Sequence, residues 1–134
     1  MRSKPCLTLD DANQIVTAGK AEAAKNGWAI CIVIVNDAGI PLHLERMDGA
    51  HLQTVEIATR KARTAAVSRT STKILEDLIK DRPSLLAMPD RLPVQGGIPI
   101  LYQGECVGGV GVSGAKSHED EQVAKAGLAA LGIA

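Results

Sequence analysis

An uninterrupted apolar run at residues 29–35, with the sequence AICIVIV, constrains the fold more than any other feature of the chain. The run is rich in β-branched side chains and too short for a typical helix, which favours a strand that is buried on both faces. The tetrapeptide NDAG at 36–39 has the composition of a turn, and residues 40–47 return as a second strand. These segments predict an antiparallel hairpin inside a covered sheet.

Amphipathic segments on either side of this hairpin predict helices. Thr8 can cap a first helix that has acidic residues in its first turn, apolar residues at helical spacing and a stop at Asn26 and Gly27. A stripe of small residues predicts a second helix from residue 50 to about residue 69. Thr72 can cap a further short helix, and Ser117 begins the last one.

The remaining segments complete a mixed fold. Residues 82–99 contain four prolines and a Gly-Gly pair, which predicts an irregular connector of a length that is often functional. Residues 98–112 are expected to form two strands joined around Gln103 and Gly104. Because tight turns join adjacent strands in antiparallel order, the chain is expected to be one α+β domain over residues 1–134, with helices on both faces of an antiparallel sheet.

Composition excludes several classes of function. The 15 basic and 15 acidic residues balance, which argues against partners such as nucleic acid or an anionic membrane. Trp28 and Tyr102 are the only aromatic residues, too few for a base-stacking platform. Three cysteines without paired spacing, no apolar leader at the N-terminus and no long apolar stretch predict a cytoplasmic protein without a membrane span.

The glycines at 109–114 match the pattern GxGxxG, which also occurs in dinucleotide-binding folds. Such a site requires a βαβ unit with an acidic residue about 20 positions later, whereas here no strand is expected after the last helix. We therefore interpret these glycines as positions where a strand approaches another backbone closely.

Lys61 is the one cation on a hydroxyl-rich helical stripe that also contains Thr54, Thr64 and Ser68. The stripe can line a polar pocket for an anionic ligand, or it can form a solvated edge of the helix. Near the end of the connector, Gly96 and Gly97 have the same ambiguity. They can form a nest of backbone amides for a carboxylate or phosphate, or a plain turn.

The three histidines do not form a zinc site, because no Cys-His cluster or HExxH motif is present. His51 follows a turn at 48–50 and opens a predicted helix, a position from which a loop can present it to a cleft. It is therefore our candidate for a metal ligand, namely an axial ligand of haem iron.

Several ordered motifs together resemble the GlcG/HbpS family over nearly the whole chain. These motifs are NDAG at 36–39, RMDGA at 46–50, KARTA at 61–65, PVQGGIP at 93–99, GECVGGVGVSG at 104–114 and DEQVAKAG at 120–127. The resemblance implies a profilin-like three-layer α/β/α fold with a five-stranded antiparallel sheet, and assembly into a homo-oligomer. It also implies a ligand pocket shared by Arg46, Asp48, Lys61, Gly96 and Gly97.

The resemblance leaves three hypotheses open. In the first, the chain is a cytoplasmic, oligomeric protein that binds a small molecule, with haem or a related tetrapyrrole as the cofactor. Arg46 and Lys61 would pair with propionates, the amides of Gly96 and Gly97 would bind an anion, and His51 would ligate the iron.

The second hypothesis is an enzyme that acts on a small hydroxy-acid, oxo-acid or aldehyde, with Lys61 as base or Schiff-base nucleophile. That role requires a lowered pKa of Lys61. The third is an accessory protein that binds an enzyme of diol, glycerol or glycolate catabolism through its oligomeric surface. Some relatives of the family belong to such catabolic operons, which is the basis of this hypothesis.

Overall fold

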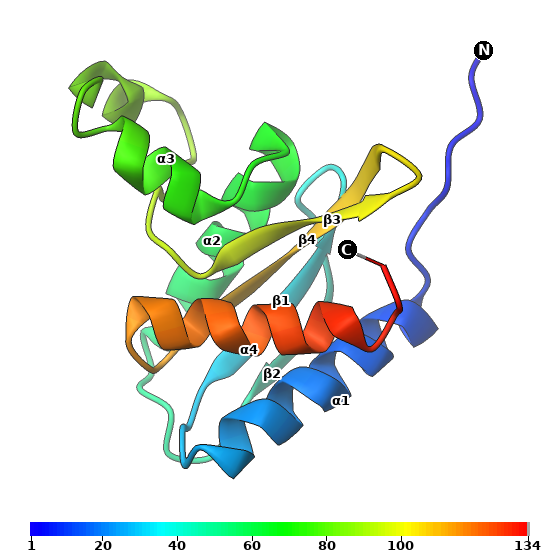
Figure 1. Ribbon diagram of the computed structural model, residues 1–134, viewed down its shortest axis with the longest axis vertical. Coiled ribbons are helices and arrows are strands. Elements are labelled where there is room, and N and C mark those ends of the chain that lie inside the picture. The colour runs from blue at the N-terminus through cyan, green and yellow to red at the C-terminus, as the bar shows by residue number, and fades with distance from the viewer. Residues whose placement is uncertain (134) are drawn as a thin grey trace.

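Four antiparallel strands form the sheet of this computed structural model, which describes residues 1–133 (Figure 1). The strands lie in the order β2-β1-β4-β3. Their bounds are Cys31–Asn36 for β1, Pro41–Arg46 for β2, Gly97–Tyr102 for β3 and Glu105–Ser113 for β4. Both predicted hairpins are confirmed, since β1 pairs with β2 and β3 with β4.

The expected five-stranded sheet is wrong, because within residues 1–133 only four segments pair into the sheet. Residues 1–8 form no strand, and the connector contains Pro83, Pro89 and Pro93. Proline has no N–H to donate and is disfavoured inside a sheet. The connector instead forms a short 3₁₀ helix, η1, over Pro83–Ala87. The α+β class is confirmed with four strands.

Helices cover both faces of the sheet. Helices α1 (Leu9–Lys25) and α4 (Ser117–Ala129) lie side by side over one face, and α2 (Thr54–Ser68) lies on the other (Figure 1). Strand β1 supplies both cores: Ile32 and Ile34 pack beneath α1 and α4, whereas Cys31, Val33 and Val35 pack against α2. This two-sided burial is the physical reason for the continuous apolar run at 29–35.

Small residues let α2 approach the sheet closely. A Cβ on Gly111 would lie 2.1 Å from the carbonyl oxygen of Ala58, and one on Gly109 would lie 2.4 Å from that of Ala62. Both distances are shorter than any normal contact, so only glycine fits at these positions of β4. The interpretation of the GxGxxG segment as a place of close backbone approach is therefore confirmed.

The helix ends follow the sequence signals with two exceptions. Helix α2 begins at Thr54 and not at residue 50, so His51 precedes the helix instead of opening it. Thr8 forms the capping box of α1 with Asp11, as predicted. Helix α3 (Thr72–Leu78) has Ser71 as its N-cap, so the predicted capping role of Thr72 is wrong. The Thr72 hydroxyl instead accepts a hydrogen bond from the Gly97 N–H at 2.9 Å.

Helices α3 and η1 form an arm that projects from the body (Figure 1). Within residues 1–133, none of the helices combines the length and apolar composition that a bilayer crossing requires.

Candidate functional site

Lys61 is buried inside the protein and is held by two oxygen atoms. Its Nζ donates a hydrogen bond to Asp120 Oδ2 at 3.1 Å and another to the Val112 carbonyl at 3.0 Å. The side chains of Lys61 and Asp120 are each 3% exposed. The second oxygen of Asp120 accepts the Ala115 N–H at 3.0 Å. The ion pair thus links α2, on one face of the sheet, to the start of α4, on the other.

Gly96 makes room for this ion pair. Its φ of +131° is a conformation that favours glycine, and a Cβ there would lie 2.8 Å from Lys61 Nζ and 3.1 Å from Asp120 Cβ. Gly97 lies equally close to α2, since its Cβ would meet the Lys61 carbonyl oxygen at 2.4 Å. The structure therefore brings Lys61, Gly96 and Gly97 together, as the resemblance implied, in a closed cluster of satisfied polar groups.

Burial dominates the electrostatics of this cluster. Desolvation raises the pKa of the Asp120 carboxyl above its ordinary value, although the neighbouring Lys61 ammonium and the Ala115 N–H act in the opposite direction. A buried charge of this kind depends on its partner, so the pair is costly to open.

Arg46 and Asp48 lie elsewhere, in an open groove between α1 and the end of β2. The groove has a volume of about 730 Å³. Its walls include Thr17, Lys20, Glu45, Arg46, Met47 and Asp48. Lys20 Nζ contacts Glu45 Oε2 at 2.9 Å. Arg46 takes part in none of the ion pairs found within residues 1–133.

His51 lies in the segment that joins this groove to α2. Its side chain is exposed, and its carbonyl oxygen accepts hydrogen bonds from Thr54 at the start of the helix. Among residues 1–133 no group of three His, Cys, Asp or Glu side chains has the arrangement of a metal site. His51 is thus exposed near the groove, while Lys61 is enclosed, and the structure does not join all six predicted residues in one pocket.

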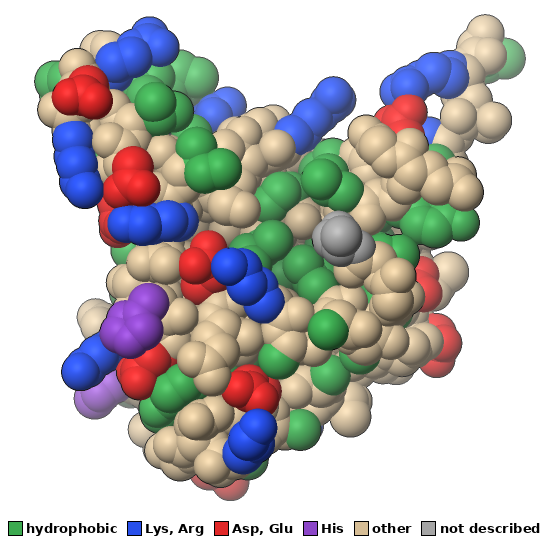
Figure 2. Space-filling model, in the orientation of Figure 1, with side chains coloured by type: hydrophobic (Ala, Val, Ile, Leu, Met, Phe, Trp, Pro, Cys, Tyr) green, Lys and Arg blue, Asp and Glu red, His purple; other side chains and the backbone are tan. Residues whose placement is uncertain are grey.

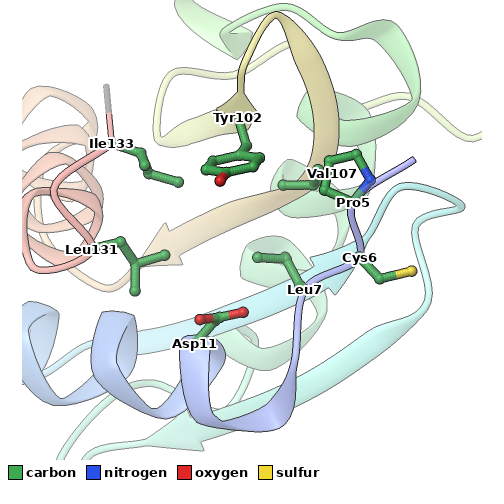
Figure 3. A pocket seen from close by; sticks show the side chains of 8 residues that line it. All are labelled: Pro5, Cys6, Leu7, Asp11, Tyr102, Val107, Leu131 and Ile133. Carbon is green, nitrogen blue, oxygen red and sulfur yellow. The ribbon is translucent and has the colours of Figure 1, made fainter. Parts of the chain in front are cut away.

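A second cavity was not predicted from the sequence. It has a volume of about 270 Å³ and lies between the N-terminal segment, the start of α1, the β3–β4 hairpin and the segment after α4 (Figure 3). Most of its wall is apolar, and its polar groups belong to Cys6, Asp11 and Tyr102. These segments are remote from one another in the sequence, so no local pattern could have indicated the cavity. The one available signal was the scarcity of aromatic residues, which makes Tyr102 conspicuous.

Comparison with known proteins places the chain in a family. A family model described as "Haem degrading protein HbpS-like" matches residues 7–129. Protein GlcG of Escherichia coli K12 is 39% identical over 114 residues, which are 84% of this chain and 85% of that protein. Corrinoid adenosyltransferase PduO of Salmonella typhimurium LT2 is 27% identical over 95% of this chain, and the match covers 39% of PduO.

Solved structures agree with this assignment. The crystal structure of a double mutant of Streptomyces reticuli HbpS has a TM-score of 0.92 and 36% identity, over 98% of this chain and 90% of that one. A crystal structure described as a PduOC:heme complex has a TM-score of 0.89 and 25% identity, over 97% and 98% of the two chains. The resemblance read from the sequence motifs is confirmed, and the chain belongs to the HbpS-like family.

Proposed function

We propose that this protein binds haem or a related tetrapyrrole. The observation that carries the proposal is the similarity, over 97% of this chain, to a PduOC chain solved with haem. The family model, with its haem-degrading description, supports the same ligand class.

The groove between α1 and β2 is the place where we propose that the tetrapyrrole binds. Its volume of about 730 Å³ lies within the range of roughly 300–1,000 Å³ that is usual for small-molecule sites. Arg46 is among the residues that line the groove, and arginine binds a carboxylate such as a propionate through two parallel hydrogen bonds. Lys20 on the facing helix adds a second cation, which now contacts Glu45.

Two side chains near the groove are suitable axial ligands for iron. His51 lies three positions after Asp48, so at most about 10 Å of extended chain joins them. Met47 lines the groove, and a thioether is also an axial ligand in some haem proteins. We assign the ligand role to His51, because its exposed imidazole can turn toward the groove without breaking a packed contact.

Lys61, Gly96 and Gly97 are left out of this proposed site for an energetic reason. If Lys61 turned to a ligand, Asp120 would remain buried without its partner, at a cost of about 3–5 kcal/mol. The same burial weighs against the enzymatic hypothesis, since a base or Schiff-base lysine must meet its substrate.

A haemin titration followed by absorbance tests the proposal. We expect a saturable Soret shift at about one haem per subunit, with Arg46→Gln weakening binding and His51→Ala changing the Soret position. Arg82→Gln and His118→Ala are matched controls, because both side chains are exposed and neither lines the groove. A response that does not saturate would contradict haem binding. Saturation with no effect of Arg46→Gln or His51→Ala would contradict the proposed place alone.

We further propose that the chain forms a homo-oligomer through its projecting arm. The arm presents exposed apolar side chains that include Ile74, Leu78 and Leu86. Figure 2 shows apolar and charged side chains side by side on the arm. Apolar groups clustered on a surface favour contact with another molecule.

A further inference from the structure

From the second cavity we infer a separate binding site, for a small organic cation that carries a primary ammonium on an apolar body. The site is independent of the tetrapyrrole proposal, because none of its lining residues belongs to the groove between α1 and β2. The cavity is small, its wall is mostly apolar, and a carboxylate and an aromatic ring lie on opposite sides of it (Figure 3).

The volume limits the ligand to a small molecule. A cavity of about 150 Å³ holds benzene, so the 270 Å³ found here holds about ten non-hydrogen atoms. A porphyrin macrocycle is far larger than this. Side chains of Leu7, Val107 and Leu131 line the space and would remove an apolar ring of matching size from water (Figure 3).

Asp11 supplies the charge at one side of the cavity. One of its oxygens accepts the Thr8 N–H at 2.9 Å, and among residues 1–133 no other donor reaches this carboxylate. The nearby cations of the N-terminal segment are already paired, Arg2 with Glu105 and Lys4 with Asp37. The carboxylate is half-buried and faces the cavity (Figure 3), so it is available to a ligand cation.

Tyr102 supplies an aromatic ring on the opposite side of the same cavity (Figure 3). The face of an aromatic ring attracts an ammonium group by about 0.5–1 kcal/mol at partly exposed sites. Cys6 is not part of the recognition, because its sulfur points away from the cavity in Figure 3. A cation that enters between Asp11 and Tyr102 is therefore favoured over a neutral molecule, and an anion of the same shape is disfavoured.

Titration of the full chain with benzylamine, benzyl alcohol and benzoate, followed by amide NMR shifts, tests this inference. These probes share one ring and differ in charge. We expect saturable shifts at Leu7, Tyr102, Val107 and Leu131 with benzylamine, weaker binding of benzyl alcohol and no binding of benzoate. Asp11→Asn should weaken benzylamine binding by about fivefold and leave benzyl alcohol unchanged. An asparagine oxygen can still accept the Thr8 N–H, so the cap is retained.

Asp10→Asn is the matched control, since Asp10 accepts a hydrogen bond from Gln14 and does not line the cavity. It should leave the affinity for benzylamine unchanged. Tyr102→Leu removes the ring, keeps an apolar wall, and should weaken benzylamine more than benzyl alcohol. The inference is overturned if no probe saturates, if benzoate binds as well as benzylamine, or if Asp10→Asn and Asp11→Asn have equal effects.

Discussion

At the scale of single residues, the Lys61–Asp120 ion pair joins the two helical layers around the glycine at position 96. Buried charges lose their hydration, and here three hydrogen bonds replace it, two from Lys61 Nζ and one from the Ala115 N–H. The partners are 59 residues apart, so the helical stripe that contains Lys61 could not indicate which acid it would meet. Both interpretations left open by the sequence, a ligand pocket and a solvated edge, assumed contact with water.

Replacing one partner of this pair should be strongly destabilising. We expect Lys61→Met to lower the free energy of unfolding by about 3–5 kcal/mol, because Asp120 stays buried without a cation. In the double variant Lys61→Met/Asp120→Asn the costs should not add, with a coupling energy of about 1–3 kcal/mol. Urea unfolding of the wild type, Lys61→Met, Asp120→Asn and the double variant measures this coupling energy.

The exposed pair formed by Lys73 and Asp77 is the control for this cycle. Lys73→Met should lower the free energy of unfolding far less than Lys61→Met, since water screens exposed pairs. If the cost of Lys61→Met were as small as that of Lys73→Met, the buried ion pair would have no structural role.

Cys31 provides a pH prediction. Burial raises the pKa of its thiol to about 11, from an ordinary value of 9.0. The folded protein therefore keeps a proton that the unfolded chain loses above pH 9, and the contribution to stability present below pH 9 disappears as the pH rises through 11. Relative to Cys31→Ala, the free energy of unfolding of the wild-type protein should fall by about 2–3 kcal/mol between pH 9 and 11.

Chemical unfolding at several pH values measures this difference. The alanine variant has a constant packing cost, so only the thiol makes the difference change with pH. A difference that is the same at pH 8 and pH 11 would mean that Cys31 titrates normally in the folded protein.

At the scale of elements, the contact between α2 and β4 decides how closely the layers pack. Alanines on the helix meet glycines on the strand, and both sets were visible as periodic small residues in the sequence. This is why the strands, helices and close approach could be predicted locally. The number of strands could not, because the fifth strand came from the resemblance and no segment of the chain has the pattern to form it.

Gly111→Ala should be destabilising through this contact. The new Cβ would lie 2.1 Å from the Ala58 carbonyl oxygen and 2.5 Å from the Ala62 nitrogen, so α2 must move away from the sheet. Overpacking of this kind costs about 1–3 kcal/mol. Gly19→Ala is the control, because its new Cβ meets mainly the flexible end of the Ile32 side chain at 2.7 Å. Thermal unfolding should show a much larger fall in melting temperature for Gly111→Ala than for Gly19→Ala. Equal falls would contradict a rigid contact between Gly111 and the helix backbone.

At the scale of the whole molecule, the predicted site residues divide between an enclosed cluster and an open groove. The motifs identify the family because they are local, whereas a groove or cavity is formed by segments that only the fold brings together. Thus Arg46 and Asp48 were predicted as ligand-binding residues, but Thr17 and Lys20 on the facing helix were not. They have no local signal beyond that of an ordinary helix surface.

The projecting arm leads to a prediction about assembly. Its apolar side chains stand beyond the body, and a chain with balanced charges has little repulsion to keep its copies apart. We expect light scattering after gel filtration to give a mass above that of one 14.0 kDa subunit. The double variant Ile74→Gln/Leu86→Gln should shift the mass toward that of one subunit, because it removes apolar area from the contact.

Leu52→Gln is the matched control, since Leu52 is 81% exposed but lies before α2 and outside the arm. A wild-type mass of one subunit at every concentration would exclude a stable oligomer, and an equal effect of Leu52→Gln would place the contact elsewhere.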